Sequence, residues 1–165
     1  SVNFSAQDFD DPAFLDQLLK TLQETGLPTS AVHLEITERL LLRQAEHVRD
    51  VLEQCRDHGM EISIDDFGTG YSSLSYLHQY PVTTLKIDKS FIGNMTSDDG
   101  ALGLVRSILS LSDNMGLAII AEGVETEQQV SMLRSLRCQV AQGYYFARPL
   151  NEQDAIAALM GRNHA

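Results

Sequence analysis

The chain has 165 residues, of which 43% are hydrophobic and 21% are charged, and its 12 Lys and Arg against 23 Asp and Glu give a formal net charge of −11. This length and apolar content suffice for one domain with a sizeable core and exclude a disordered chain. The acidic surface argues against binding of DNA or anionic lipid, and no apolar run approaches the roughly 18 residues of a membrane span.

Short strand-like runs alternate with helical stretches along the whole chain. The expected strands are Ser1–Ser5, Val32–Thr37, Glu61–Asp65, Thr84–Ile87, Leu117–Ala121 and Gln139–Gln142. The expected helices run from Asp11 to near Gly26, from Glu38 to about His58, near Ser72–His78, and over Gly100–Asn114, Glu127–Leu136 and Glu152–Met160. This alternation is typical of a parallel α/β sheet, either an open doubly wound sheet or a barrel.

The two cysteines lack the spacing of a metal site. Cys55 falls in a helical stretch and Cys138 opens the sixth strand-like run. We therefore expect two reduced thiols in a cytoplasmic protein.

Polar side chains gather where the expected strands end. Alternate residues of a strand point to opposite faces, and along each run one set of alternate residues is apolar while the other is repeatedly polar. In Val32–Thr37, for example, Leu34 and Ile36 share the apolar face and Glu35 lies on the polar one. The carboxyl ends of parallel strands hold the sites of both barrels and open α/β sheets. The candidate site comprises nine residues, namely Asn3, Glu35, Asp65, Asp66, Lys86, Asp88, Glu122, Glu125 and Gln142.

Six of these nine residues are carboxylates, which repel one another when packed together. Divalent cations relieve that repulsion, and an all-oxygen ligand set suits Mg²⁺ or Mn²⁺ rather than zinc. Because the chain bends at a strand end, both Asp65 and Asp66 are expected to face the site. A carboxylate shared by two ions would hold them about 3.5–4 Å apart, the spacing used for in-line phosphoryl displacement.

Each of these features alone also has a purely structural interpretation. An Asp-Asp pair at a strand end is more often a turn or a helix cap, and Lys86 alone would be a solvated strand end. Glu125 is a possible cap of the next helix. The run Tyr144–Phe146 fits a wall or a core as well as a platform for bases. The recurrence of polar groups at successive strand ends is what favours a site.

Six segments together carry a more specific signal. They are Val2–Ser5 (VNFS), Leu34–Glu38 (LEITE), Ile64–Leu74 (IDDFGTGYSSL), Leu85–Phe91 (LKIDKSF), Ile120–Glu125 (IAEGVE) and Gln142–Leu150 (QGYYFARPL). In this order they resemble the motifs of the EAL family of cyclic di-GMP phosphodiesterases, and they cover nearly the whole chain. The resemblance implies a (β/α)8 barrel of the TIM type, with about six βα units present, so that residues 1–165 form a partial EAL domain. It also implies hydrolysis of cyclic di-GMP to linear pGpG with two Mg²⁺ or Mn²⁺ ions, and inhibition by Ca²⁺.

The resemblance assigns roles to individual residues. It implies that Asn3, Glu35 and Asp65 bind one metal, that Asp65 bridges both, and that Asp66 and Glu122 bind the second. Lys86 would contact the attacking water, as a general base or as electrostatic support. The remaining catalytic positions would be Glu122, with Asp88 and Glu125 holding Lys86 and the water. The substrate-binding positions would be Gln142, Asp66, Tyr144 and Pro149. Because Leu85 and Ile87 supply the packing, Lys86 is expected to act in chemistry more than in folding.

A loop completes the expected machinery. Glu38 matches a residue that steadies the loop Phe67–Ser73, which includes Gly68, Thr69 and Gly70. In the family this loop lies between the metal site and a dimer interface, so a homodimer is expected, and dimerisation would tune metal binding. Sensory or diguanylate-cyclase-like domains are expected in the parent chain, and membrane anchoring of that parent chain is left open.

The chain also departs from the family pattern. No Glu-Ala-Leu tripeptide occurs, and the sequence opens on what resembles the third strand. Since such barrels need about 250 residues, two strands and one metal-binding glutamate are expected to be missing. Residues 1–165 alone are therefore expected to be a weak or inactive phosphodiesterase that associates through its exposed sheet edge.

Two other functions stay open at this point. One is a catalytically inactive receptor for cyclic di-GMP, and the other is an interaction module that binds no nucleotide. The intact metal-ligand positions favour the enzyme.

Overall fold

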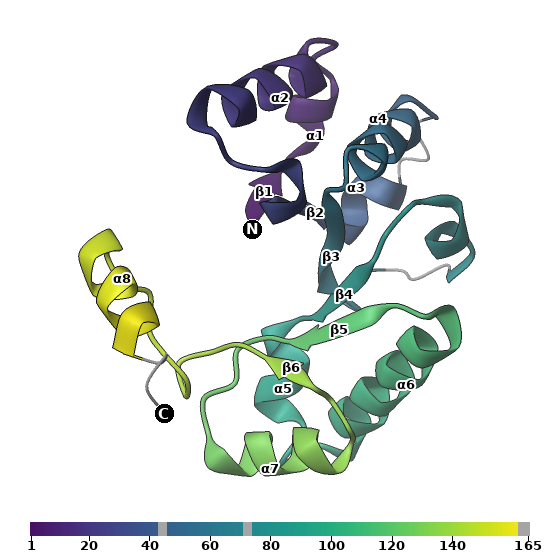
Figure 1. The fold of residues 1–165 in the computed structure, drawn as a ribbon. Helices are drawn as coiled ribbons and strands as arrows, with labels where there is room; N and C mark the ends of the chain where they lie inside the picture. The colour runs from purple at the N-terminus through teal and green to yellow at the C-terminus, as the bar shows by residue number, and fades with distance from the viewer. Residues whose placement is uncertain (43–45, 71–73, 162–165) are drawn as a thin grey trace.

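The computed structural model (Figure 1) describes residues 1–42, 46–70 and 74–161. Its centre is one parallel sheet, in which the strands are paired in the order of the sequence. The strands are β1 (Val2–Phe4), β2 (His33–Thr37), β3 (Glu61–Phe67), β4 (Thr84–Ile87), β5 (Ala118–Ala121) and β6 (Val140–Ala141). A doubly wound sheet reverses its strand order at a switch point, whereas a barrel adds each strand beside the last. The observed order is therefore that of a barrel.

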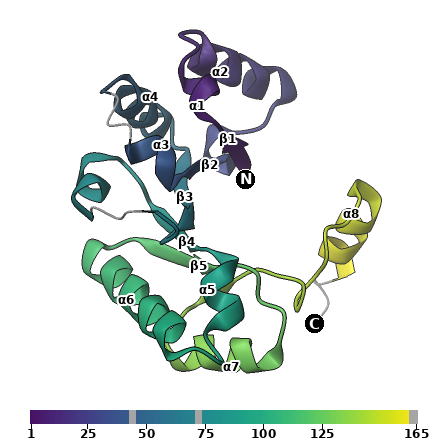
Figure 2. The same ribbon diagram turned by 180° about the vertical axis from the view of Figure 1, so that it is seen from behind.

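Helices cover the outer side of the curved sheet. The helices are α1 (Ala6–Phe9), α2 (Phe14–Thr25), α3 (Glu38–Leu42), α4 (Glu46–Asp57), α5 (Lys89–Asn94), α6 (Asp99–Met115), α7 (Glu127–Ser135) and α8 (Glu152–Gly161), with 3-10 turns η1 (Thr29–Ala31) and η2 (Leu74–Gln79). Helices α1 to α4 lie near β1 to β3, and α5 to α7 lie near β4 to β6, while α8 lies apart from them (Figures 1 and 2).

Local signals in the sequence explain where several helices begin and end. Helices α2 and α6 end at Gly26 and Gly116, whose φ angles of 70° and 67° are left-handed, which glycine adopts without a steric penalty. The carboxylate of Asp98 accepts a hydrogen bond at the start of α6. Helix α7 begins with a capping box formed by Thr126 and Gln129.

The strands bury one face against the helices. The fully buried residues of this face are Leu34, Ile36, Ile62, Ile64, Leu85 and Ile87. Each contributes about 1.5–3 kcal/mol through burial of its side chain. The opposite parity, which holds Glu35, Asp65 and Lys86, faces the other side of the sheet, and this alternation is what gathers the polar residues on one surface.

The sheet is open at both edges. Within the described residues β1 pairs only with β2, and β6 pairs only with β5. Val2 and Val140 on these edge strands keep 51% and 50% of their surface exposed. The six strands therefore form a continuous part of a barrel rather than a closed one.

The helix boundaries differ from the prediction near the N-terminus. The sequence predicted one helix from Asp11, but α1 precedes it and α2 begins only at Phe14. Asp11 was expected to cap this helix with Pro12 in its first turn, but its carboxylate accepts a hydrogen bond from the backbone N–H of Ala13 at 2.9 Å and so stabilises a turn that precedes α2. The helix predicted from Glu38 to about His58 is described as α3 and α4, with residues 43–45 outside the described residues.

Three further differences lie in the second half of the chain. The short helix predicted near Ser72–His78 is the 3-10 turn η2, and residues 72 and 73 lie outside the described residues. Helix α5 was not predicted. Strand β6 begins at Val140, so Cys138 precedes it and does not open it. Both cysteines are buried free thiols. No helix among the described residues has the length and apolar character needed to cross a membrane.

Candidate metal centre

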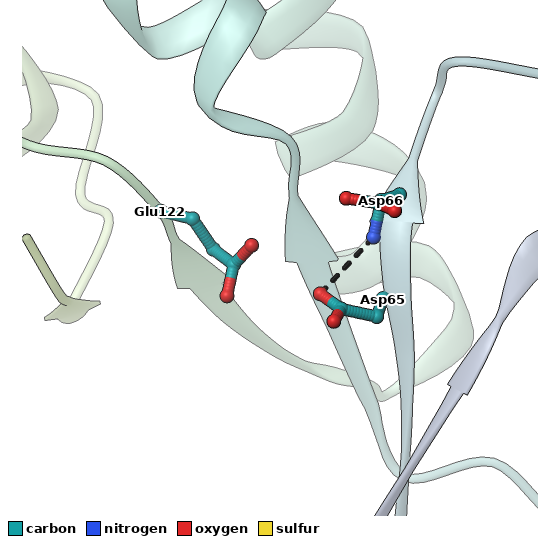
Figure 3. Close-up of side chains that lie close together, drawn as sticks. All are labelled: Asp65, Asp66 and Glu122. Carbon is teal, nitrogen blue, oxygen red and sulfur yellow. Dashed lines mark hydrogen bonds between the residues drawn. The ribbon is translucent and has the colours of Figure 1, made fainter. Parts of the chain in front are cut away.

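Two adjacent aspartates lie at the end of β3. The register between β3 and β4 shifts between Ile64 and Phe67, and Asp66 has a φ angle of 55°. A positive φ is unusual for a residue other than glycine and marks a backbone held by its surroundings. The backbone N–H of Asp66 donates to Oδ1 of Asp65 at 3.1 Å (Figure 3). This irregularity explains how two successive carboxylates reach the same site, although side chains normally alternate along a strand.

Glu122, at the end of β5, lies close to these two aspartates at the end of β3 (Figure 3). It follows β5, and its backbone N–H extends the ladder by donating to the carbonyl of Ile87 at 3.1 Å. Asp65, Asp66 and Glu122 each offer one carboxylate oxygen, and these oxygens all lie within 4.8 Å of one another (Figure 3). The side-chain amide of Gln142 donates to Oε1 of Glu122 and orients that carboxylate.

Lys86 in β4 is the cation at the centre of this acidic surface. Its Nζ lies 2.8 Å from Oε2 of Glu35, 3.1 Å from Oδ1 of Asp65 and 2.7 Å from Oε1 of Glu122. Burial lowers the pKa of Lys86, but the hydrogen bonds to Glu122, Glu35 and Asp65 outweigh burial and raise that pKa above its usual value. In this arrangement Lys86 is a charged ammonium, which suits electrostatic support.

The position of Lys86 also changes its expected role in folding. The residue is only 3% exposed, and its three partners have side chains that are 12–19% exposed. Removing the buried positive charge of Lys86 would leave its three carboxylate partners without a compensating charge. Its burial among three carboxylates indicates a role in stability, whereas the sequence predicts that Lys86 acts in chemistry more than in folding because Leu85 and Ile87 supply the packing.

The carboxylates of the cluster are electrostatically strained. Burial, and then the charges of Asp65 and Asp88, raise the pKa of Asp66. Burial also raises the pKa of Glu122, and its ion pair with Lys86 opposes this effect. Carboxylates that resist ionisation beside one another gain most from a divalent cation. The donor set is entirely oxygen, which fits Mg²⁺ or Mn²⁺.

The other two expected metal ligands lie on β1 and β2. Asn3 pairs with Glu35 in the register of β1 and β2, and Asn3 is exposed. Asp65 is opposite Thr37, so Glu35 lies two residues before the position level with Asp65. Glu35 forms an ion pair with Lys86, but it does not belong to the cluster of carboxylates formed by Asp65, Asp66 and Glu122.

Two expected partners of Lys86 lie elsewhere. Asp88 caps α5, where Oδ1 accepts from the backbone N–H of Ser90 at 2.9 Å and from its hydroxyl. Glu125 donates its backbone N–H to Oε1 of Gln129 at 2.7 Å. Within the described residues the ion pairs of Lys86 go to Glu35, Asp65 and Glu122, so neither Asp88 nor Glu125 holds its ammonium group.

A cavity of about 460 Å³ adjoins the carboxylate cluster. Glu122 and Glu125 line it together with three of the expected substrate residues, Gln142, Tyr144 and Pro149, whereas Asp66 does not. A Cβ atom at Gly143 would lie 2.2 Å from the carbonyl oxygen of Val124, so only glycine allows this close approach of the two loops.

Glu38 connects α3 to the loop after β3. The residue is 2% exposed, and its Oε2 accepts a hydrogen bond from the backbone N–H of Gly68 at 3.1 Å. A Cβ atom at Gly70 would lie 3.0 Å from Oε1 of Glu38. The hydroxyl of Thr69 donates to the carbonyl of Asp66 at 2.9 Å, so residues 67–70 touch both Glu38 and the aspartate pair. Residues 71–73 of the predicted loop lie outside the described residues.

Comparison with known families decides the classification. The family model described as EAL domain matches residues 1–149. The chain belongs to the EAL domain family. The sequential sheet and the acidic strand ends are thus those of an EAL domain, of the TIM-barrel type that the motifs implied.

Curated relatives of this EAL domain are much longer. Cyclic di-GMP phosphodiesterase NbdA of Pseudomonas aeruginosa is 38% identical over 150 residues, which are 91% of this chain and 19% of that protein. Oxygen sensor protein DosP of Escherichia coli is 38% identical over 154 residues, or 93% of this chain and 19% of that protein. The chain thus spans about a fifth of the length of these relatives.

Solved structures of EAL domains superimpose closely. The EAL domain of Mycobacterium smegmatis DcpA has a TM-score of 0.90 and 38% identity, covering 96% of this chain and 71% of that one. A complex of the phosphodiesterase PaMucR with c-di-GMP has a TM-score of 0.88 and 40% identity, covering 93% and 62%. Klebsiella pneumoniae BlrP1, in a complex with manganese and cy-diGMP, has a TM-score of 0.82 and 30% identity, covering 89% and 38%.

Proposed function

We propose that this chain is part of a cyclic di-GMP phosphodiesterase that releases linear pGpG. The observation that carries the proposal is the cluster of Asp65, Asp66 and Glu122 beside a buried Lys86. Relatives named as cyclic di-GMP phosphodiesterases, with 36–38% identity, support the choice of substrate. A receptor without activity does not need a lysine buried among three carboxylates.

We propose that the residues act as the family motifs imply. Asn3, Glu35 and Asp65 would hold one metal ion, and Asp65 would be shared with a second ion held by Asp66 and Glu122. Two Mg²⁺ or Mn²⁺ ions would activate the attacking water and neutralise charge on the phosphate oxygens. The ammonium of Lys86 stabilises negative charge at the attacked phosphorus. The water oxygen bonds to phosphorus and its proton is released to solvent, the bond from phosphorus to the 3′ oxygen breaks, and the 3′ oxygen takes up a proton from solvent.

The substrate side of the site follows from the cavity. Gln142 orients Glu122, and Tyr144 and Pro149 form the wall beside it. Asp88 and Glu125 act more remotely, since Asp88 caps α5 close to Asp66 and Glu125 lines the cavity. We place the protein in the cytoplasm, where its two free buried thiols are stable. The length of the relatives supports sensory or diguanylate-cyclase-like domains in the parent protein.

The direct test measures both binding and turnover. The full-length protein is incubated with cyclic di-GMP in Mg²⁺, Mn²⁺ or Ca²⁺, and pGpG is separated by chromatography. We expect turnover with Mg²⁺ or Mn²⁺ and inhibition by Ca²⁺. Tight binding without pGpG release would indicate a receptor instead. The absence of any nucleotide binding would indicate an interaction module.

A second prediction concerns the loop that Glu38 contacts. We propose that the protein is a homodimer in which residues 67–70 couple the dimer interface to metal binding. Glu38→Gln keeps the shape of the side chain but weakens the charge-assisted hydrogen bond to Gly68. The Mg²⁺ concentration for half-maximal activity should rise about 3- to 10-fold, the scale of one neutral hydrogen bond, because the substitution weakens the bond without removing it. It is measured by titrating initial rates with Mg²⁺.

The matched control is Glu53→Gln, which removes the same charge from a residue with a 56% exposed side chain on α4. The control should keep the Mg²⁺ dependence of the unmodified protein. If Glu38→Gln behaves like this control, the loop does not influence metal binding and the coupling proposal is wrong.

A further inference from the structure

Two basic side chains line the cavity beside the carboxylate cluster. They are Lys89, which follows the cap residue Asp88, and Arg148, in the loop after β6. Within the described part of the chain neither residue forms an ion pair, although Glu122 and Glu125 line the same cavity. The two positive charges are therefore available to a ligand in the cavity.

Both side chains are held in place by their surroundings. The guanidinium carbon of Arg148 lies 4.8 Å from the centroid of the Tyr144 ring, a cation–π contact. A Cβ atom at Gly123 would lie 2.4 Å from the Cβ of Lys89, so the stem of Lys89 packs directly on the backbone there. Substituting this glycine would push Lys89 away. The two cations are thus positioned before any ligand arrives, which lowers the entropic cost of binding.

The location favours an anionic group. In TIM barrels a phosphate is frequently bound by the loops after the last two strands. Here these loops follow β5 and β6, and they supply Glu122, Gln142 and Arg148 to one cavity. Lys86 is not available for a second phosphate, because three carboxylates already surround its Nζ. A cavity of about 460 Å³ is in the size range of small-molecule sites.

We propose that Arg148 and Lys89 bind the phosphate of the cyclic dinucleotide that is not cleaved. This inference rests on the proposed function, in which the other phosphate lies at the carboxylate cluster. A planar guanidinium matches two phosphate oxygens, and the ammonium of Lys89 adds a second positive charge. The substrate would then span from the cluster to the loop after β6.

The test uses Arg148→Gln, Arg148→Lys and Lys89→Gln in the full-length protein. Binding of cyclic di-GMP is measured by calorimetry in Ca²⁺ at several salt concentrations, and turnover is measured in Mg²⁺. Arg148→Gln should weaken binding about 10- to 100-fold, the scale of a lost charge-assisted hydrogen bond. KM should rise by a similar factor while kcat changes little, because the contact is made equally in ground and transition states. Arg148→Lys should recover part of the loss, and Lys89→Gln should cost less than Arg148→Gln.

The salt dependence distinguishes a phosphate contact from a contact to a base. Removal of a phosphate contact should make the slope of log K against log salt shallower, because salt then screens one attraction fewer between opposite charges. The control is Lys20→Gln, which changes the net charge equally at a 75% exposed side chain on α2 and should leave affinity and slope unchanged. All variants should keep the melting temperature of the unmodified protein, since Lys89 and Arg148 are exposed.

Two results would overturn the inference while leaving the proposed function intact. The first is that the unmodified protein hydrolyses cyclic di-GMP, but Arg148→Gln and Lys89→Gln both bind it with the same affinity and the same salt dependence as the unmodified protein. The second is that Arg148→Gln loses affinity for cyclic di-GMP with an unchanged salt slope and discriminates less well against cyclic di-AMP. This result would show that Arg148 contacts a guanine base and not a phosphate. If the unmodified protein neither binds nor hydrolyses cyclic di-GMP, the proposed function itself has failed, and the inference fails with it.

Discussion

Asp65→Asn is expected to lower the turnover of cyclic di-GMP by at least about 10²-fold, because the metals stabilise both the attacking and the leaving oxygens. The substitution preserves the shape of the side chain. It removes charge from a carboxylate that lies within 4.8 Å of both Asp66 and Glu122 and 3.1 Å from Nζ of Lys86. The initial rate of pGpG release at saturating Mg²⁺ measures this effect, and a Mg²⁺ titration of the melting temperature should show weaker stabilisation than in the unmodified protein.

Asp57→Asn is the matched control, because it makes the same chemical change at an exposed position near the end of α4. It should leave turnover and Mg²⁺ stabilisation unchanged. Near-normal turnover of Asp65→Asn at saturating Mg²⁺ would show that Asp65 does not bridge two ions. The assignment of Asp66 and Glu122 to a second ion would then have to be rebuilt.

The sequence predicted the strands well because their signal is local. A run such as Glu61–Asp65 alternates apolar and polar residues, and Ile62 and Ile64 are fully buried as that alternation requires. The strand order was not predictable in the same way, because an open sheet and a barrel bury similar runs. The family motifs implied a barrel, and the pairing of β1 through β6 in chain order confirms it.

Helix α5 was missed because the signals for it in the sequence are weak. Asp88 caps it by accepting from the backbone N–H of Ser90 at 2.9 Å. The helix covers only Lys89–Asn94, too few residues to display a helical repeat of apolar positions. A cap followed by Phe91 and Ile92 was the available signal, and the same Asp88 was instead interpreted as a partner of Lys86.

The residues of the candidate site lie at neighbouring strand ends, as their places in the sequence predict, but the contacts among them were not predictable. Lys86 meets Glu35 and Glu122 because β2, β4 and β5 place them on one face, which depends on register across the sheet. The irregularity that gives Asp66 a positive φ depends on the pairing of β3 with β4. Neither can be read from one segment alone.

Lys86→Met is the substitution for which the structure changes the expectation most. It should lower kcat by about 10²-fold or more, the scale on which loss of one preorganised charge-stabilising group slows a reaction. It should also destabilise the protein, because it leaves Glu35, Asp65 and Glu122 without their cation. Breaking a fully buried ion pair costs about 3–5 kcal/mol. The cost here should be smaller, since the three partner side chains keep 12–19% of their surface exposed.

Metal binding separates the two effects of this substitution. Without added metal, Lys86→Met should melt well below the unmodified protein, because three carboxylates then repel one another. Saturating Mg²⁺ should recover much of that loss, since the ion replaces the missing positive charge, whereas kcat should stay low. Melting curves with and without Mg²⁺, together with initial rates, measure both quantities. Lys20→Met, at a 75% exposed side chain, provides the control and should change neither.

Lys86→Arg sharpens the interpretation further. It keeps the positive charge, so it should recover part of the stability without metal, but the planar guanidinium cannot reproduce the point charge of an ammonium among three carboxylates. Its kcat should therefore stay well below that of the unmodified protein. A Lys86→Met protein with unchanged kcat would remove Lys86 from the chemistry. An unchanged melting temperature without Mg²⁺ would mean that the three ion pairs contribute nothing to folding.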